Sequence, residues 1–241
     1  YGNLSYDTLV HYGDESGAFG PEQEIHSWGV NEDVIREAAV DWIDRSLKAP
    51  FFLYLQTVST HHPYGTPKNY RGPVNGAGAQ ARYLNALHYT DAVLRRLYQD
   101  LERRGMVQNT ILVITGDHGQ AFGKRHPHNF THKNYLYEEN IQSFLMVADL
   151  VRIERPVISR RIGGVGDMMP TILSLVNADR VDVPGQDLLS PDCRLKQVFF
   201  HKNTHPQLWG LRDGRWKYIA QHTGNDAQLF DLETDPNEQA N

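Results

Sequence analysis

An acidic side chain and an imidazole stand next to each other where an apolar segment of the chain ends. Asp117 and His118 lie in the run Thr115–Gly119, directly after the apolar residues 110–114. In open α/β sheets, ligands bind just outside the carboxyl ends of the strands. Carboxylate oxygens and imidazole nitrogens are common protein ligands for divalent metal ions. A bare Asp-His pair is weak evidence, but with its surroundings it predicts that Asp117 and His118 bind a metal ion.

Three further residues could act on an anionic group held by such a metal. His61 follows a second apolar segment, 51–55, while His132 and Lys133 lie in a His-rich loop after Gly119. Strands that end at one edge of a sheet bring their loops together, as an active site requires. A cation there would polarise a phosphoryl or sulfuryl oxygen. We therefore predict that His61, His132 and Lys133 hydrogen-bond a tetrahedral oxyanion or protonate a leaving group.

The chain contains 12 histidines. Most of those not named above are interpreted as structural or surface residues. His126 and His128 belong to the same polar loop, so we expect them at its surface, with a role at a second metal ion as the alternative. Glu138 and Glu139 are expected to cap or solvate a helical turn.

Composition and charge exclude several classes of protein. The 241 residues are 40% hydrophobic and 22% charged, as in an ordinary globular protein with one core and a small subdomain. The net charge of -5, without a long basic stripe, argues against nucleic acid as a partner. The single Cys193 excludes an internal disulfide framework and a Cys-based zinc site. Because the chain opens at Tyr1 without Met, we expect it to be part of a longer protein.

Hydrophobic periodicity predicts alternating helices and strands. The expected helices cover 31–47, 79–104 and 167–176, and the expected strands cover 51–55, 110–115, 143–147 and 198–200. A strand, a crossover helix and a strand in succession form a βαβ unit, which favours a parallel sheet. Near the end of the chain, 216–220 and 228–232 are expected to form a hairpin around Gly224 and Asn225.

The motifs around these residues resemble the sulfatase family of the alkaline phosphatase superfamily. The run Thr115–Gly119 is followed by Ala121–Gly123 and then by His132–Glu139, while Thr60–Pro63 follows the apolar segment 51–55. The resemblance covers nearly the whole chain. It implies an α/β fold, an alkaline-phosphatase-like three-layer sandwich with a mainly parallel central sheet, plus a small C-terminal β-hairpin subdomain.

Two other segments refine this resemblance. The tail, with Leu211–Tyr218 and Leu229–Pro236, resembles the small C-terminal subdomain of sulfatases. It implies a catalytic-domain portion over 1–195 and a subdomain over 196–241. The run His26–Val30, followed by Asp33, instead resembles the lipoteichoic-acid-synthase-like branch, which transfers phosphoglycerol from lipid.

The resemblance also implies roles for individual residues. Asp117 and His118 match the metal pair in the second half of the family's catalytic domain. His61 matches a substrate-contacting histidine, and His132 matches the substrate histidine of transferase-like members. Lys133 falls where sulfatases carry an active-site lysine, and which of His132 and Lys133 does the work stays open.

Three functions remain open at this point. The first is an enzyme that hydrolyses sulfuric or phosphoric esters through a covalent intermediate, usually with Ca²⁺. The second is a transferase that moves phosphoglycerol or phosphoethanolamine between a membrane lipid and a glycan, usually with Mn²⁺ or Zn²⁺. The third is a non-catalytic binding or regulatory domain with a sulfatase fold. Either enzyme implies one divalent metal, a sulfate- or phosphate-ester substrate and a periplasmic or cell-surface location; the transferase implies a membrane-anchored parent protein.

One part of the family pattern is missing from the sequence. Members carry a Cys, Ser or Thr nucleophile and acidic metal ligands in a first half of the domain, which we do not find here. Cys193 lies in Ser190–Arg194, which lacks the order Cys-x-Pro-x-Arg of the family. We therefore expect the C-terminal portion of a catalytic domain, inactive alone and dependent on its missing N-terminal half for stability.

Overall fold

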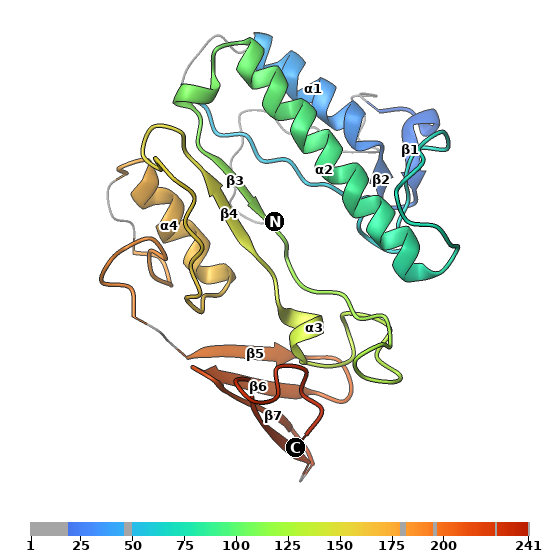
Figure 1. Ribbon diagram of the computed structural model, residues 1–241, viewed down its shortest axis with the longest axis vertical. Coiled ribbons are helices and arrows are strands. Elements are labelled where there is room, and N and C mark those ends of the chain that lie inside the picture. Colours follow the sequence, from blue (N-terminus) through green and yellow to red (C-terminus); the bar gives the residue numbers. More distant parts are fainter. Residues whose placement is uncertain (1–18, 46–49, 179–181, 195–196, 225, 241) are drawn as a thin grey trace. The chain divides into compact units, whose positions relative to one another are not determined.

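The computed structural model describes residues 19–45, 50–178, 182–194, 197–224 and 226–240 (Figure 1). The chain divides into two compact units, residues 1–107 and 108–241, and each is described by itself. No helix in the described ranges combines the length and apolar character needed to cross a membrane.

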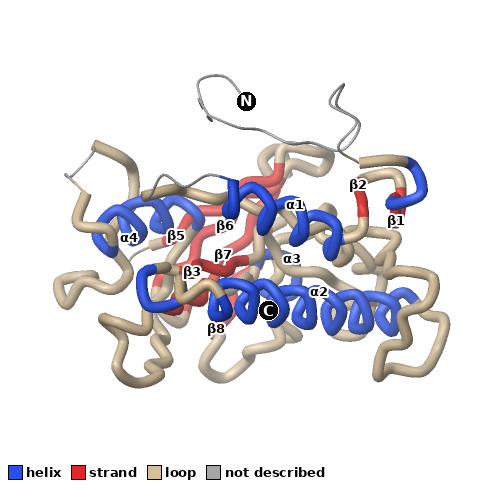
Figure 2. Tube along the Cα trace, turned by 90° about the horizontal axis from the view of Figure 1, so that it is seen from above, coloured by secondary structure: helices blue, strands red, loops and turns tan. Residues whose placement is uncertain are grey.

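Two helices form the body of the first unit. Helix α1 spans Glu32–Arg45 and helix α2 spans Ala79–Arg103, so both predicted helices are confirmed over their described residues. They run side by side in Figure 2 and bury apolar side chains of both: Ala39, Val40, Ile43, Ala86, Tyr89, Val93, Leu97 and Leu101. Before them come the short helix η1 (Pro21–Gln23) and the antiparallel strands β1 (Glu24–His26) and β2 (Gly29–Val30).

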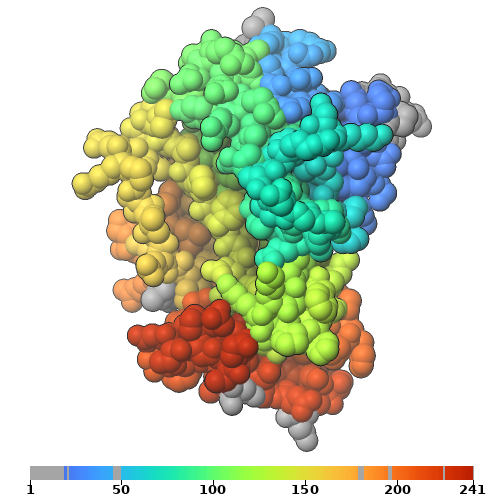
Figure 3. Space-filling model, turned by 45° about the vertical axis from the view of Figure 1, so that its right-hand side comes forward, coloured from blue at the N-terminus to red at the C-terminus, as the bar shows by residue number. Residues whose placement is uncertain are grey.

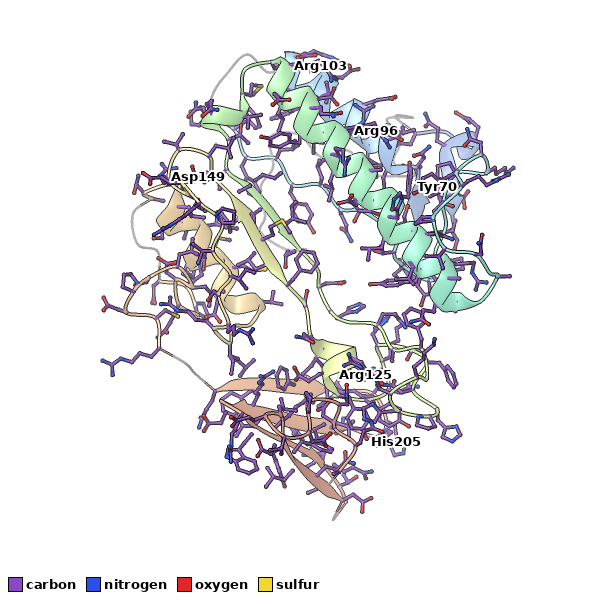
Figure 4. The ribbon with its side chains drawn as sticks, viewed as in Figure 1. Tyr70, Arg96, Arg103, Arg125, Asp149 and His205 are labelled. Atoms are coloured by element: carbon purple, nitrogen blue, oxygen red, sulfur yellow. The ribbon has the colours of Figure 1, made fainter. Side chains whose placement is uncertain are left out.

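Charged residues also join the two helices. Arg96, labelled on α2 in Figure 4, places its Nη2 2.7 Å from Oδ2 of Asp33 on α1. Arg36 contacts both Asp33 and Asp100. Burial alone would raise the pKa of Asp33, but hydrogen bonds and charge from Arg96 and Arg36 outweigh burial and hold that pKa below its usual value.

The predicted strand at 51–55 is wrong. These residues form no strand, and the ladders among the described residues are all antiparallel. Phe52 and Tyr54 are 68% and 64% exposed. An apolar run predicts burial, but a strand also needs a neighbour that accepts its hydrogen bonds. The βαβ pairing expected from this segment is therefore absent from the described residues.

The second unit begins with a two-stranded ladder after the short helix η2 (Val107–Asn109). Strand β3 (Leu112–Thr115) pairs antiparallel with β4 (Leu145–Ala148), from Leu112 opposite Ala148 to Thr115 opposite Leu145. Both predicted strands are thus confirmed. Between them lies the one-turn helix α3 (Glu138–Ile141), and after them come η3 (Val165–Asp167) and the predicted helix α4 (Met168–Leu175).

An antiparallel sheet of four strands closes the chain. Its order is β5 (Val198–Lys202), β6 (Leu208–Asp213), β7 (Trp216–Gln221) and β8 (Ala227–Asp231). The expected strand near 198–200 and the expected hairpin are confirmed, whereas β6 was not predicted. One face packs Leu208, Ile219 and Phe230 against Leu136. In Figure 3 the C-terminal strands (red) adjoin the yellow-green segment near residue 125.

A buried ion cluster joins this sheet to α3. Lys217 of β7 is fully buried, and its Nζ lies 3.0 Å from Glu138 Oε1 and 2.7 Å from Glu238 Oε1. Arg212 of β6 places Nη1 2.7 Å from Glu138 Oε2. The backbone N–H of Glu138 donates to Glu238 Oε2 over 2.6 Å. Glu138 does lie in the first turn of α3, but the expectation that it caps or solvates this helical turn is wrong, since Glu138 is a buried partner of two cations.

Replacement of Lys217 tests the weight of this cluster. Lys217→Met would leave Glu238 buried without its ammonium partner and Glu138 paired with Arg212 alone, so we expect a loss of about 3–5 kcal/mol in the free energy of unfolding. Denaturant unfolding of the full-length protein measures this loss. Arg215→Met is the matched control, because the Arg215–Glu233 pair is exposed and should change stability little. Equal effects of the two substitutions would contradict the assignment.

Candidate functional site

The loop that carries most of the predicted site residues leaves the end of β3. Thr115 Oγ1 donates to the carbonyl oxygen of Phe144 over 2.8 Å, and Ser143 Oγ donates to that of Gly116 over 2.5 Å. These bonds tie the start of the loop to the residues just before β4. The backbone at Asp117 is therefore held in place, although the Asp117 side chain is 87% exposed.

Asp117 and His118 present two electron-pair donors side by side. His118 Nδ1 lies 2.7 Å from the carbonyl oxygen of Gly119, which can only accept, so Nδ1 carries the proton. In the neutral ring Nε2 then holds the lone pair, and it lies 3.4 Å from Asp117 Oδ2. The other carboxylate oxygen, Oδ1, accepts the backbone N–H of His118 over 2.9 Å.

This pair fits one divalent cation. Two atoms bound tetrahedrally to one ion at about 2.0–2.1 Å lie about 3.4 Å apart. The bond from His118 Nδ1 to a backbone carbonyl is the usual support that orients a metal-binding imidazole. Within the described ranges, no group of three or more His, Cys, Asp or Glu side chains could hold a metal. Asp117 and His118 would therefore supply two ligands of a larger set.

The imidazole of His132 stacks on that of His118. Its ring lies 3.9 Å from that of His118 between centroids, at an interplanar angle of 24°. Its Nδ1 is 3.1 Å from Gln120 Oε1. Lys133 is exposed, and its backbone N–H donates to Thr131 Oγ1 over 3.1 Å. The structure thus brings Asp117, His118 and His132 together, with Lys133 adjacent in the chain.

His61 belongs to the first unit and is described there alone. Its Nδ1 lies 2.8 Å from the carbonyl oxygen of His62, and its ring contacts that of Trp28 at 4.7 Å. Buried Glu32 of α1 holds the preceding loop, because its Oε1 accepts the backbone N–H groups of Val58 and Ser59. His61 therefore sits on a loop that is anchored to a helix.

The contacts of several residues that support the loop were not predicted from the sequence. His126, expected at the surface, is largely buried: Nδ1 lies 2.9 Å from Glu139 Oε1, and Nε2 lies 3.0 Å from the carbonyl oxygen of Glu238. Its ring stacks on Tyr137 at 3.7 Å. Asn129 donates to Glu139 and exchanges hydrogen bonds with Asn140. No local signal marks the contact with Glu238, which is 112 residues from His126.

The comparison with protein families decides the classification. The profile described as Sulfatase matches residues 2–178. The chain belongs to the sulfatase family. The predicted family is therefore confirmed, and so is the prediction that the chain derives from a family of enzymes. Sulfatases and related enzymes of the alkaline phosphatase superfamily use a divalent metal ion.

Curated relatives include both branches expected from the sequence. The chain is 23% identical to lipoteichoic acid synthase 1 of Bacillus subtilis (strain 168), over 100% of this chain and 36% of that protein. It is 28% identical to arylsulfatase K of Mus musculus, over 83% of this chain and 40% of that protein. The chain thus spans 36% and 40% of the lengths of these two relatives.

A solved structure supports the fold class. A protein of the alkaline phosphatase superfamily from Vibrio parahaemolyticus superimposes with a TM-score of 0.70 and 22% identity, over 91% of this chain and 51% of that one. The predicted alkaline-phosphatase-like α/β fold is therefore confirmed. In the present chain, the expected C-terminal hairpin is part of a larger, four-stranded sheet, β5–β8.

Gly119 shows how tightly the site loop is packed. A Cβ atom there would lie 2.5 Å from the carbonyl oxygen of Glu139, and the Gly119 N–H donates to the carbonyl oxygen of Asn140 over 3.0 Å. Alanine would therefore push the loop away from α3.

We expect Gly119→Ala to lower the free energy of unfolding by about 1–3 kcal/mol, as overpacked sites do. Displacement of His118 should also lower turnover and metal content of the full-length protein. Gly166→Ala is the control, because a Cβ at Gly166 meets nothing within 4 Å. Calorimetry, metal analysis and steady-state kinetics measure the three effects. If Gly119→Ala leaves stability, metal content and turnover unchanged, the loop tolerates the added methyl group and the expectation is wrong.

Proposed function

We propose that this chain is part of a metal-dependent enzyme that acts on sulfate or phosphate esters. The observation that carries the proposal is the cluster of Asp117, His118 and His132, with an oxygen–nitrogen pair 3.4 Å apart under a stacked imidazole. In the proposed site, Asp117 and His118 would hold one divalent metal ion. His132 and Lys133 contact the non-bridging oxygens or the leaving group.

The chemistry follows from where charge develops. A divalent metal bound there would polarise an ester oxygen and stabilise negative charge in the transition state. His132 and Lys133 would add hydrogen-bond donors, and His61 is proposed as a further substrate contact. The nucleophile that forms a covalent intermediate is proposed to lie outside these residues, since the chain spans a minority of each relative.

The leading activity is hydrolysis of sulfate esters, supported by the family profile and by similarity to arylsulfatase K. The second candidate is phosphoglycerol transfer from a membrane lipid, because the match to lipoteichoic acid synthase 1 covers the whole chain. The imidazole ligand favours Mn²⁺ or Zn²⁺, whereas Ca²⁺ usually takes oxygen ligands only. For either activity we propose a location outside the cytoplasm, and residues 196–241 as the C-terminal subdomain.

Substitution of the metal pair tests the proposal in the full-length protein. We expect Asp117→Asn and His118→Asn each to reduce bound divalent metal and to lower kcat/KM by about 100-fold, because outer-shell changes alone cost about 10- to 100-fold. Bound metal is measured by elemental analysis. Turnover is measured on 4-nitrophenyl sulfate and on an aryl ester of glycerol phosphate.

His128→Asn serves as the control, since His128 is an exposed histidine of the same loop. Turnover of the sulfate alone supports the hydrolase, and turnover of the glycerophosphate ester alone supports the transferase. Retention of metal and activity by Asp117→Asn would overturn the site. A wild-type protein without turnover of either ester would support a non-catalytic domain.

A further inference from the structure

Gln120 follows the proposed metal pair in the chain, and its side-chain amide makes three polar contacts. Its Nε2 donates to the carbonyl oxygen of Ala121 over 2.9 Å and to that of Phe130 over 3.3 Å. Its Oε1 lies 3.1 Å from His132 Nδ1. The side chain therefore bridges both ends of the loop that carries the site.

These contacts fix which way the amide points. Both partners of Nε2 are carbonyl oxygens, which can only accept hydrogen bonds. A flipped amide would place Oε1 against those two oxygens and would lose both bonds. The atom that faces His132 is therefore an acceptor, and His132 Nδ1 must carry the proton that it receives.

We propose that Gln120 is a positioning residue that selects the Nδ1–H tautomer of His132, an inference that rests on the proposed function. In that tautomer, Nε2 is the nitrogen that accepts a proton from the substrate side or returns one to a leaving group. Gln120 itself touches no reacting atom. It acts through His132.

The same selection operates on the ring beneath. His118 Nδ1 donates to the carbonyl oxygen of Gly119, so Nε2 of that ring faces Asp117. Two successive residues of the loop, Gly119 and Gln120, thus supply the acceptors for two stacked imidazoles. Each imidazole uses Nδ1 for support and Nε2 for chemistry, in a stack only 3.9 Å apart.

Two substitutions separate the acceptor from the donors of Gln120. Gln120→Glu keeps an oxygen for His132 Nδ1–H but gives up the donors to Ala121 and Phe130. Gln120→Met keeps the length of the side chain and removes both the acceptor oxygen and the N–H donors. A positioning role through His132 predicts that Gln120→Met loses the Nδ1–H tautomer and that Gln120→Glu retains it.

The tautomer is read from imidazole ¹⁵N chemical shifts in the full-length protein labelled with ¹⁵N-histidine. The His132 signals are assigned by their loss in His132→Asn. We expect a protonated Nδ1 in wild type and in Gln120→Glu, and a gain of the Nε2–H tautomer in Gln120→Met. Turnover should fall about 10- to 100-fold in Gln120→Met through kcat, with little change in KM. Gln120→Glu should restore part of that kcat.

The two proposals fail in different ways. An Nε2–H tautomer in wild type, or the same tautomer in Gln120→Met, would overturn the role of Gln120 while leaving the metal site intact. If neither ester is turned over, the proposed function fails, but the shifts still decide the tautomer. If Gln120→Met lowers thermal stability and changes KM and kcat to the same extent, the side chain of Gln120 only holds the loop together. That result also overturns the inference.

Discussion

The buried ammonium group of Lys217 is the constraint on which the second unit depends. A buried charge is costly unless it is paired, and Lys217 is paired with Glu138 and Glu238 at 3.0 and 2.7 Å. Helix α3 is a single turn, too short to be stable by itself. Its position is therefore set by ion pairs to the C-terminal sheet, so a local element depends on residues far along the chain.

Helix α3 in turn holds the loop that carries the proposed site. Asn140 accepts the N–H of Gly119 through its carbonyl oxygen and exchanges side-chain hydrogen bonds with Asn129. Glu139 accepts from His126 and from Asn129. The loop backbone is thus fixed at both ends while Asp117 projects outward. A fixed backbone under exposed functional groups is how a scaffold positions chemistry on a loop.

The sequence predicted those parts of the structure whose information is local. Helices α1 and α2 follow from apolar periodicity, and Asp117, His118 and His132 from a motif next to a strand. The segment 51–55 failed because an apolar run does not specify a strand partner. Gln120 was not singled out, and His126 and Glu138 were given the wrong surroundings for a related reason. Their roles depend on tertiary partners, and Lys217 lies 79 residues from Glu138.

The stacked imidazoles would couple the proposed metal site to the proposed substrate contact. Because the rings of His118 and His132 lie 3.9 Å apart, neither ring can move toward the other without displacing it. A change in the metal ligand would therefore also move the group proposed to meet the substrate. Supports for both Nδ1 atoms come from Gly119 and Gln120, and Gly119 is in turn fixed by α3. The geometry of the proposed site therefore depends, through α3, on the ion pairs buried against the C-terminal sheet.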